Sequence, residues 1–286
     1  MELFLDLLRS VVYGVIEGIT EWLPISSTGH MILAEQVLKF SLSAEFMEMF
    51  RVVIQLGAIM AVVVLYFKKL WPFCGDNGCD SGLAKHIRWP VLRLWLKIIV
   101  ACLPAAVLGL LLDDWMDAHF YNSVVVAVML IVYGIAFILI ERRPRVPTTT
   151  KLSRITYKQA IIVGAWQVLA LIPGTSRSGA TIIGGLLCGM SRACASQFTF
   201  FLAIPVMAGA SGLKLVKFLV GGGVFTVAEV GALLVGCIVA FVVSIMAIRF
   251  LMDYVKKHTF TIFGWYRIVL GILVLGIWAL QTFVLA

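Results

Sequence analysis

The fold is decided by residues 14–30, which read GVIEGITEWLPISSTGH. An apolar helical pattern stops here at Pro24, passes through a run of hydroxyl residues, and resumes as an apolar stretch over 31–38. Residues 164–180, GAWQVLALIPGTSRSGA, repeat the pattern 150 positions later. Proline cannot continue a helix and restricts the residue before it. Both segments are therefore predicted to be broken helices, and the chain is predicted to contain an internal repeat.

The composition of the whole chain predicts a protein of the lipid bilayer. Hydrophobic residues make up 62% of the 286 residues and charged residues 13%, whereas soluble domains average about 45 to 50% and about 25%. This balance excludes a disordered chain, a disulfide-stapled secreted module and a nucleic-acid-binding protein. Crossing the hydrocarbon core takes roughly 20 apolar residues in a helix. Six stretches meet that length: 50–67, 94–112, 123–140, 198–219, 228–250 and 262–284.

The two broken segments, over about 7–38 and 158–190, are each followed by three of these stretches. Since three is odd, the second half must begin on the opposite side of the membrane from the first. Non-helical backbone at membrane depth is tolerated only when it is buried in protein or lines a wet cavity. We therefore expect an all-α integral membrane protein with six transmembrane helices and two re-entrant helix-loop-helix hairpins. The repeats, 1–150 and 151–286, are expected to be inverted within one structural domain, with a site near the midplane.

Basic residues predict the orientation, because cytoplasmic loops are enriched in Lys and Arg. Segments 68–97 and 142–158 each hold six basic residues and are expected to be cytoplasmic. The N-terminus, the first hairpin and the C-terminus then fall outside. Lys214 and Lys217 fall on the outer side under this topology and weaken it.

Six cysteines occur in the chain, and they suggest no disulfide framework. Cys74 and Cys79 frame Gly-Asp-Asn-Gly. A metal or redox pair is disfavoured there, because metal sites usually have four ligands with tighter spacing.

Ionisable residues in the broken segments indicate function, because a charge at the centre of a membrane helix costs roughly 2.5 to 3.5 kcal/mol. These residues are Glu17, Glu21, His30 and Arg177. Glu17 and Glu21 are four positions apart, so both carboxylates project from one helical face. Their mutual repulsion is relieved by a divalent cation, and oxygen ligands suit Mg²⁺ or Ca²⁺. The alternative is a solvated face of a helix at the membrane surface.

Hydroxyl residues at both breaks predict an anion site. Each set precedes an apolar helical run, where it can cap free N–H groups, and a helix N-terminus attracts anions. Arginine adds a planar fork that matches phosphate oxygens. Taken together, these features favour a phosphate or diphosphate ligand. The alternative for any single hydroxyl is that it serves only as a helix cap. The candidate binding residues are Ser26, Thr28, Thr175, Ser176, Arg177 and Ser178, with Ser27 between the first two.

The residues also carry a family resemblance. EGITE at 17–21 resembles the E/Q-x-x-x-E motif of the undecaprenyl-diphosphatase family of the bacitracin-resistance type. PGTSRSGAT at 173–181 resembles the P-G-x-S-R-S-x-x-T motif of the same family. The likeness extends through 26–30, 53–58 and 201–206 to the pair Tyr266-Arg267, and so covers nearly the whole chain.

The resemblance implies an enzyme of the bacterial inner membrane that hydrolyses undecaprenyl diphosphate to undecaprenyl phosphate and inorganic phosphate. Such an enzyme recycles the lipid carrier of cell-wall synthesis, confers bacitracin resistance, and meets its substrate on the periplasmic face. By the same resemblance, Glu17 and Glu21 would hold the metal and Arg177 would clamp the phosphates. Ser27 and His30 would act at the reacting phosphorus, and the remaining hydroxyls would contact the substrate.

The attacking atom stays open at this point. Ser27, with His30 as base, can form a phosphoserine that water later cleaves, or metal-bound water can attack directly. Attack by Ser27 is the favoured hypothesis.

The main rival is a secondary transporter or lipid flippase, since inverted repeats with broken helices are also transporter architecture. A carboxylate pair beside a nucleophile favours the enzyme, whereas a simple anion carrier needs only the arginine and the helix dipoles. The expected partners are the undecaprenyl diphosphate substrate and membrane lipids, with no nucleic acid. Whether the chain is a monomer or a homodimer is open from the sequence.

Overall fold

The computed structural model describes residues 2–38, 40–74, 86–143 and 146–283. Within these ranges the backbone forms helices, short connections and two isolated bridges, and no strands. Six helical segments are long and apolar enough to cross a membrane: Ala44–Leu70, Trp89–Leu112, Ser123–Arg142, Arg192–Val220, Val227–Lys257 and Thr261–Phe283. Each contains most or all of one predicted span. The prediction of an all-α, multi-pass membrane protein with six transmembrane helices is therefore confirmed.

The first half of the chain is built from six helices: α1 (Glu2–Thr20), α2 (Ser27–Val37), α3 (Ala44–Val53), α4 (Gln55–Leu70), α5 (Trp89–Phe120) and α6 (Ser123–Arg142). The second half contains η1 (Leu152–Arg154), α7 (Tyr157–Val168), η2 (Leu169–Leu171), α8 (Arg177–Leu187), α9 (Arg192–Val220), α10 (Val227–Lys257) and α11 (Thr261–Phe283). Helices α3 and α4 together make the first span, with Ile54 between them.

Local sequence explains where several of these helices begin. Thr156 caps α7 in a capping box with Gln159, and Thr226 caps α10 in the same way with Glu229. In this arrangement the hydroxyl accepts from a free backbone N–H while the third residue of the helix bonds back to the cap. Both starts follow the T-x-x-Q/E pattern and could be located from sequence.

The two predicted helix breaks are present. Helix α1 ends at Thr20 and α2 starts at Ser27, while α8 starts at Arg177 after α7 and η2. Ser26 and Ser176, which are 150 positions apart, have φ values of 71° and 70°, and no other described residue except glycine has a positive φ. The same unusual backbone therefore occurs at the same place in both copies.

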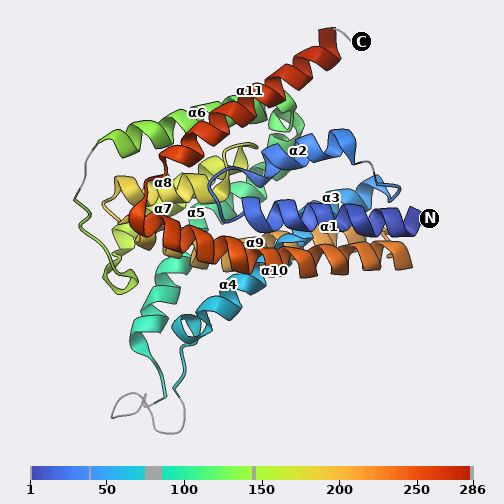
Figure 1. Cartoon of the computed structure of the whole chain (residues 1–286). Helices are drawn as coiled ribbons and strands as arrows, with labels where there is room; N and C mark the ends of the chain where they lie inside the picture. Colours follow the sequence, from blue (N-terminus) through green and yellow to red (C-terminus); the bar gives the residue numbers. More distant parts are fainter. Residues whose placement is uncertain (1, 39, 75–85, 144–145, 284–286) are drawn as a thin grey trace.

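Helix pairing also matches between the halves. Helix α1 packs along α10, α7 packs along α5, and α6 lies beside α11 (Figure 1). A Cβ on Gly134 would meet the Gly264 carbonyl oxygen at 2.7 Å, and a Cβ on Gly264 would meet the Gly134 oxygen at 2.7 Å. Reciprocal contacts of this kind accompany two-fold arrangements. The inverted orientation, the re-entrant placement in a membrane and the boundary near residue 150 stay predictions.

The largest apolar cluster among the buried residues that the structure describes contains much of α9 and residues next to both breaks. Phe198, Phe200 and Phe201 are fully buried there, and the Trp22 ring meets Phe200 edge-on with ring centres 5.3 Å apart. This packing holds the end of α1 against α9 and fixes the position of Glu21, which precedes Trp22.

The cysteines differ in one respect from the prediction. Cys74 is disulfide-bonded, although no disulfide was expected. Cys79 lies outside the described residues. The cysteines Cys102, Cys188, Cys194 and Cys237 are free, as expected for small apolar side chains within or beside apolar stretches.

Candidate active site

The two helix breaks meet through an ion pair between Glu21 and Arg177. Nη2 of Arg177 donates to Oε1 of Glu21 at 2.9 Å, and Nε donates to the same oxygen at 3.2 Å. Only 8% of the Glu21 side chain and 11% of the Arg177 side chain are exposed. Removing one partner of such a buried pair leaves an uncompensated charge, at a cost of about 3 to 5 kcal/mol. The expected contact between the carboxylate and the guanidinium is confirmed.

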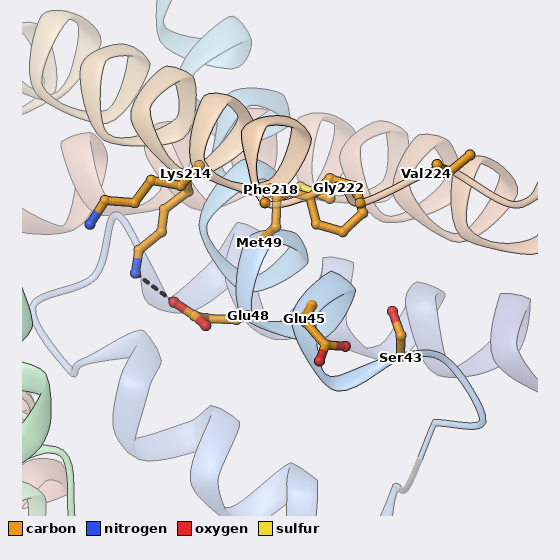
Figure 2. A pocket seen from close by; sticks show the side chains of 11 residues that line it. Ser43, Glu45, Glu48, Met49, Lys214, Phe218, Gly222 and Val224 are labelled. Atoms are coloured by element: carbon orange, nitrogen blue, oxygen red, sulfur yellow. Dashed lines mark hydrogen bonds and ion pairs between the residues drawn. The ribbon is translucent and has the colours of Figure 1, made fainter.

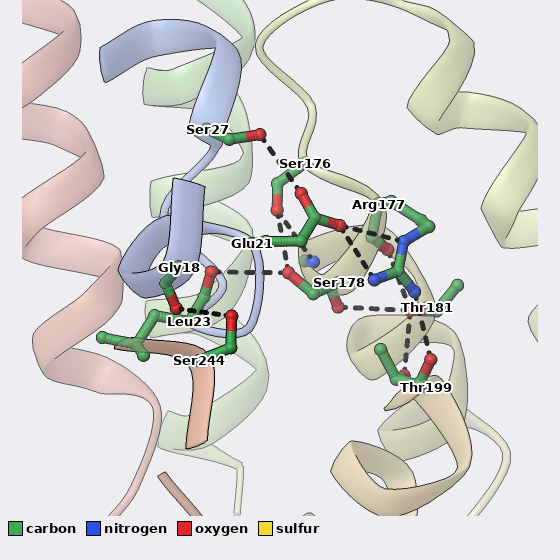
Figure 3. A network of polar contacts seen from close by, with 11 residues as sticks. Gly18, Glu21, Leu23, Ser27, Ser176, Arg177, Ser178, Thr181, Thr199 and Ser244 are labelled. Atoms are coloured by element: carbon green, nitrogen blue, oxygen red, sulfur yellow. Dashed lines mark hydrogen bonds and ion pairs between the residues drawn. The ribbon is translucent and has the colours of Figure 1, made fainter. Parts of the chain in front are cut away.

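Ser27 joins this pair from the first position of α2. Its hydroxyl donates to Oε2 of Glu21 at 3.3 Å (Figure 3). Glu21 therefore binds the guanidinium with one oxygen and the serine with the other. A nucleophile candidate, an anionic proton acceptor and a cation consequently lie within one cluster.

Residues of α8 and α9 hold the Arg177 side chain in place. Its Nη1 donates to the carbonyl of Thr199 at 3.0 Å, and the Thr199 hydroxyl donates to that of Thr181 at 2.9 Å. Thr181 donates in turn to the carbonyl of Arg177 at 2.8 Å. The guanidinium also lies 6.0 Å from the centre of the Trp22 ring. These contacts orient the fork toward Glu21, as Figure 3 shows.

Two serines of the second break complete the network. The hydroxyl of Ser176 accepts from the backbone N–H of Gly179 at 3.2 Å and lies 3.1 Å from the Ser178 hydroxyl. Ser178 donates to the carbonyl of Leu23 at 3.4 Å, which links the second break to the first. Ser176 thus caps α8, while Ser178 holds the two breaks together.

Three further predicted binding residues lie at the same breaks. The hydroxyls of Ser26 and Thr175 are fully buried, and neither has a hydrogen-bond partner. Thr28 is half-buried in the first turn of α2. Buried hydroxyls without partners are uncommon in proteins, and the binding roles of Ser26, Thr28 and Thr175 stay predictions.

Glu17 lies one turn before Glu21 and is 1% exposed, and its Oε1 has no hydrogen-bond partner. Among the described residues, no three His, Cys, Asp or Glu side chains form a cluster able to hold a metal. A buried carboxylate oxygen without a partner beside a second carboxylate nevertheless fits Mg²⁺, which one or two carboxylates can hold while water and phosphate complete its shell, whereas Ca²⁺ would need more oxygen ligands.

His30 has contacts different from those expected of a base for Ser27. Its Nδ1 donates to the Ser26 carbonyl at 2.7 Å, and its Nε2 lies 2.7 Å from the Tyr266 hydroxyl. A carbonyl can only accept, so in the neutral ring Nε2 accepts from Tyr266. The role of His30 at the phosphorus stays a prediction, and Glu21 is the group that Ser27 contacts.

Comparison with known proteins bears on this cluster. The family model described as "Bacitracin resistance protein BacA" matches residues 10–273. The chain belongs to the BacA family. Its match includes both breaks and all six spans, apart from the end of the last.

Several relatives of this BacA-family protein are named undecaprenyl-diphosphatase. One from Enterococcus faecalis strain V583 is 60% identical over 278 residues, which are 96% of this chain and 99% of the relative. One from Lactococcus lactis subsp. lactis is 57% identical over 275 residues, 95% of this chain and 96% of the relative. One from Desulfitobacterium hafniense is 55% identical over 285 residues, 98% of each.

Arg267 is a residue of this BacA-family protein whose role the sequence analysis missed. Its side chain is fully buried and donates to carbonyls of both breaks: Pro24 at 3.2 Å, Gly174 at 2.8 Å and Thr175 at 2.9 Å. It also donates to carbonyls of α6 at 3.4 Å. The available signal is a charge inside the predicted span 262–284, since such a charge needs buried polar partners.

Proposed function

We propose that this BacA-family protein is a membrane enzyme that hydrolyses undecaprenyl diphosphate to undecaprenyl phosphate and inorganic phosphate. The observation that carries the proposal is the buried cluster of Glu21, Ser27 and Arg177, assembled from both helix breaks. The names of the relatives, at 55 to 60% identity over nearly the whole chain, support this activity. Bacitracin resistance fits the description of the family.

Arg177 binds the diphosphate in this proposal. Phosphoryl transfer depends mainly on positioning and on neutralising charge around the phosphorus. A guanidinium can bind two phosphate oxygens at once, and Arg177 is already oriented by Thr199. The hydroxyls of Ser26 and Thr175, which lack partners, supply further donors to phosphate oxygens. Ser178 and Ser176 keep the second break in place.

Ser27 attacks the terminal phosphorus in the favoured route. The Oγ–P bond forms, the phosphoanhydride bond to the lipid phosphate breaks, and undecaprenyl phosphate leaves with the bonding electrons. The proton of Ser27 passes to Glu21, whose Oε2 accepts its hydrogen bond. Water then hydrolyses the phosphoserine and releases inorganic phosphate. Direct attack by water on the diphosphate is the alternative route.

Glu17 and Glu21 would hold the divalent cation. When bound, Mg²⁺ or Ca²⁺ would neutralise the negative charge of the diphosphate and of the two carboxylates. The carboxyl oxygen of Glu17 that has no partner supports this assignment.

The proposed location is the bacterial inner membrane, with the site opening toward the periplasm. This placement rests on the basic segments 68–97 and 142–158, which are expected to be cytoplasmic. The C-terminal ends of α4 and α6, where these segments begin, lie away from both chain termini (Figure 1). A long prenyl chain leaves hydrocarbon at a cost of about 0.8 kcal/mol per CH₂. The substrate tail is therefore proposed to stay in the bilayer while its head reaches the breaks.

The test is phosphate release from undecaprenyl diphosphate by purified protein in detergent, with and without a chelator. Glu21→Gln should reduce kcat/KM at least about 100-fold, because it removes the partner of Arg177 and the proton acceptor of Ser27. Glu48→Gln is the matched control. Its carboxylate also forms an ion pair, with Lys214 at 2.7 Å, but its side chain is 63% exposed and does not belong to the candidate active site. Full activity of Glu21→Gln would refute the site, and activity unaffected by chelator would refute the cation.

A further inference from the structure

A cavity of about 420 Å³ lies at the basic-loop end of the molecule, away from the candidate active site. It is formed where the end of α4, the start of α5, residues 150–153, the start of α9 and the end of α10 converge. Its volume is in the range of ordinary ligand sites. None of the residues discussed above for the diphosphate lines it.

The cavity is cationic at its rim. Lys69, Arg88 and Lys151 line it together with the hydroxyl residues Thr150 and Ser153, and no Asp or Glu is among the lining residues that the structure describes. Nη1 of Arg88 donates to the carbonyls of Lys68 and Trp71, at 2.6 Å and 3.2 Å. These two bonds hold the guanidinium at the rim, so its position does not depend on a ligand.

The floor of the cavity is apolar and its surroundings are those of a membrane surface. Val91, Leu94 and Cys194 line it and are buried. Trp71 and Trp89, which adjoin the rim in sequence, are 48% and 45% exposed. Exposed tryptophan is enriched at the level of lipid headgroups. A ligand with one anionic group and an attached apolar part therefore matches the cavity better than a free ion.

A second cavity of about 560 Å³, between α3 and the connection from α9 to α10, provides the contrast. It is lined by Glu45 and Glu48 as well as Lys214 and Lys217, and Glu48 pairs with Lys214 at 2.7 Å (Figure 2). Equal numbers of both charges give no preference for an anion there. The charge of the first cavity is thus a property of that place, not of every cavity in a basic protein.

We propose that the cavity lined by Lys69, Arg88 and Lys151 binds the phosphate of an anionic phospholipid headgroup. The ammonium and guanidinium groups bind the phosphate oxygens, the hydroxyls of Thr150 and Ser153 bind the polar headgroup, and the apolar floor contacts the glycerol and first acyl carbons. Basic pockets between transmembrane helices bind anionic headgroups in this way. A phospholipid and a free phosphate ion share the phosphate group, so both could bind the cationic rim. The apolar floor favours the lipid, because only the lipid has an apolar part to place there.

Native mass spectrometry of the detergent-solubilised full chain tests the proposal. Dioctanoyl phosphatidylglycerol should bind at least about tenfold more tightly than dioctanoyl phosphatidylcholine, and the double variant K69Q/K151Q should abolish that preference. The charge-retaining K69R/K151R should keep it. The matched control R142Q/K158Q removes two exposed charges at the same end of the molecule but outside the cavity, and should keep it as well.

Three results would overturn the proposal. Equal loss in R142Q/K158Q would show that binding depends on general surface charge, and equal loss in K69R/K151R would show that charge is not what the cavity supplies. Displacement of the lipid by glycerol 3-phosphate or inorganic phosphate at equal concentration would assign the cavity to free phosphate. Phosphate release from the proposed substrate, measured on each variant, confirms folding, because no substituted residue belongs to the candidate active site.

Discussion

The break between α1 and α2 and the break between α7 and α8 share a backbone but differ in chemistry. Ser26 and Ser176 both have φ near 70°. The Ser176 hydroxyl caps its helix through Gly179, whereas the Ser26 hydroxyl makes no cap and has no partner. Ser176 therefore stabilises the start of α8, whereas the Ser26 hydroxyl stabilises no helix start.

The two breaks also differ in the charged residues that they carry. Glu17 in the first repeat corresponds to Gln167 in the second, and both are buried with side-chain atoms that lack partners. The first break contributes carboxylates and Ser27, and the second contributes Arg177. Because opposite charges come from different halves, neither half holds the complete cluster. The same backbone motif therefore presents two carboxylates and a serine in one repeat and a guanidinium in the other.

The largest effect is expected from removing one serine hydroxyl from each repeat, which tests the difference between the two breaks. Ser27→Ala should lower the single-turnover rate of phosphate release about 10³-fold or more, equivalent to about 4 kcal/mol. Ser176→Ala should lose less than about tenfold, because it removes a cap worth about 1 kcal/mol of stability. Labelling from a substrate with a tagged terminal phosphate should mark wild type and not Ser27→Ala. A near-normal rate in Ser27→Ala would establish direct attack by water.

Arg177→Lys tests whether the second break supplies a fork or only a charge. Lysine cannot place two N–H groups on Glu21 while donating to Thr199, so kcat/KM should fall about 100-fold, or about 2.7 kcal/mol. Arg192→Lys is the matched control, since Arg192 makes a comparable fork with Glu141 elsewhere in the protein. It should lose activity less than about threefold. Equal losses in steady-state assays would mean that the Arg177 fork has no specific role.

Arg267→Lys tests whether the two breaks depend on a common support. Lysine cannot reach the carbonyls of Pro24, Gly174 and Thr175 together, so unfolding in detergent should become easier by about 2 kcal/mol. The exposed Arg249→Lys should change the melting temperature little. Activity should fall with stability and recover at lower temperature, as expected of a positioning residue. An unchanged melting temperature would show that the breaks are held by other contacts.

The smallest effect is expected from glycine at the two strained serines. A non-glycine residue with positive φ costs of order 1 kcal/mol, so Ser26→Gly should leave the free energy of unfolding unchanged or raise it slightly. Ser176→Gly also loses the cap to Gly179, and should be less stable than Ser26→Gly by about 1 kcal/mol. Thermal unfolding of both variants measures the difference. The reverse order would contradict the comparison of the two breaks.

Much of this molecule could be predicted from local patterns. The spans follow from apolar length, the breaks follow from Pro24 and Pro173, and the contact of Glu21 with Arg177 follows from the repeat. The partners of His30 and Arg267 could not be predicted, because Tyr266 and the carbonyls of Gly174 and Thr175 lie more than 90 residues away from them. A sequence shows that a buried charge needs partners and does not show which distant backbone provides them.

The sequence by itself determined that this chain is a helical membrane protein with two broken helices and a small set of charged residues at the breaks. Those properties depend on neighbours within a few residues: apolar runs, prolines and the spacing of Glu17 from Glu21. Only the tertiary structure decided that Ser27 donates to Glu21 and that His30 bonds to Tyr266. It also showed that Arg267 supports both breaks. Hydrogen bonds are directional over about 3 Å, so their partners are fixed by how the helices pack and not by the residues that carry the groups.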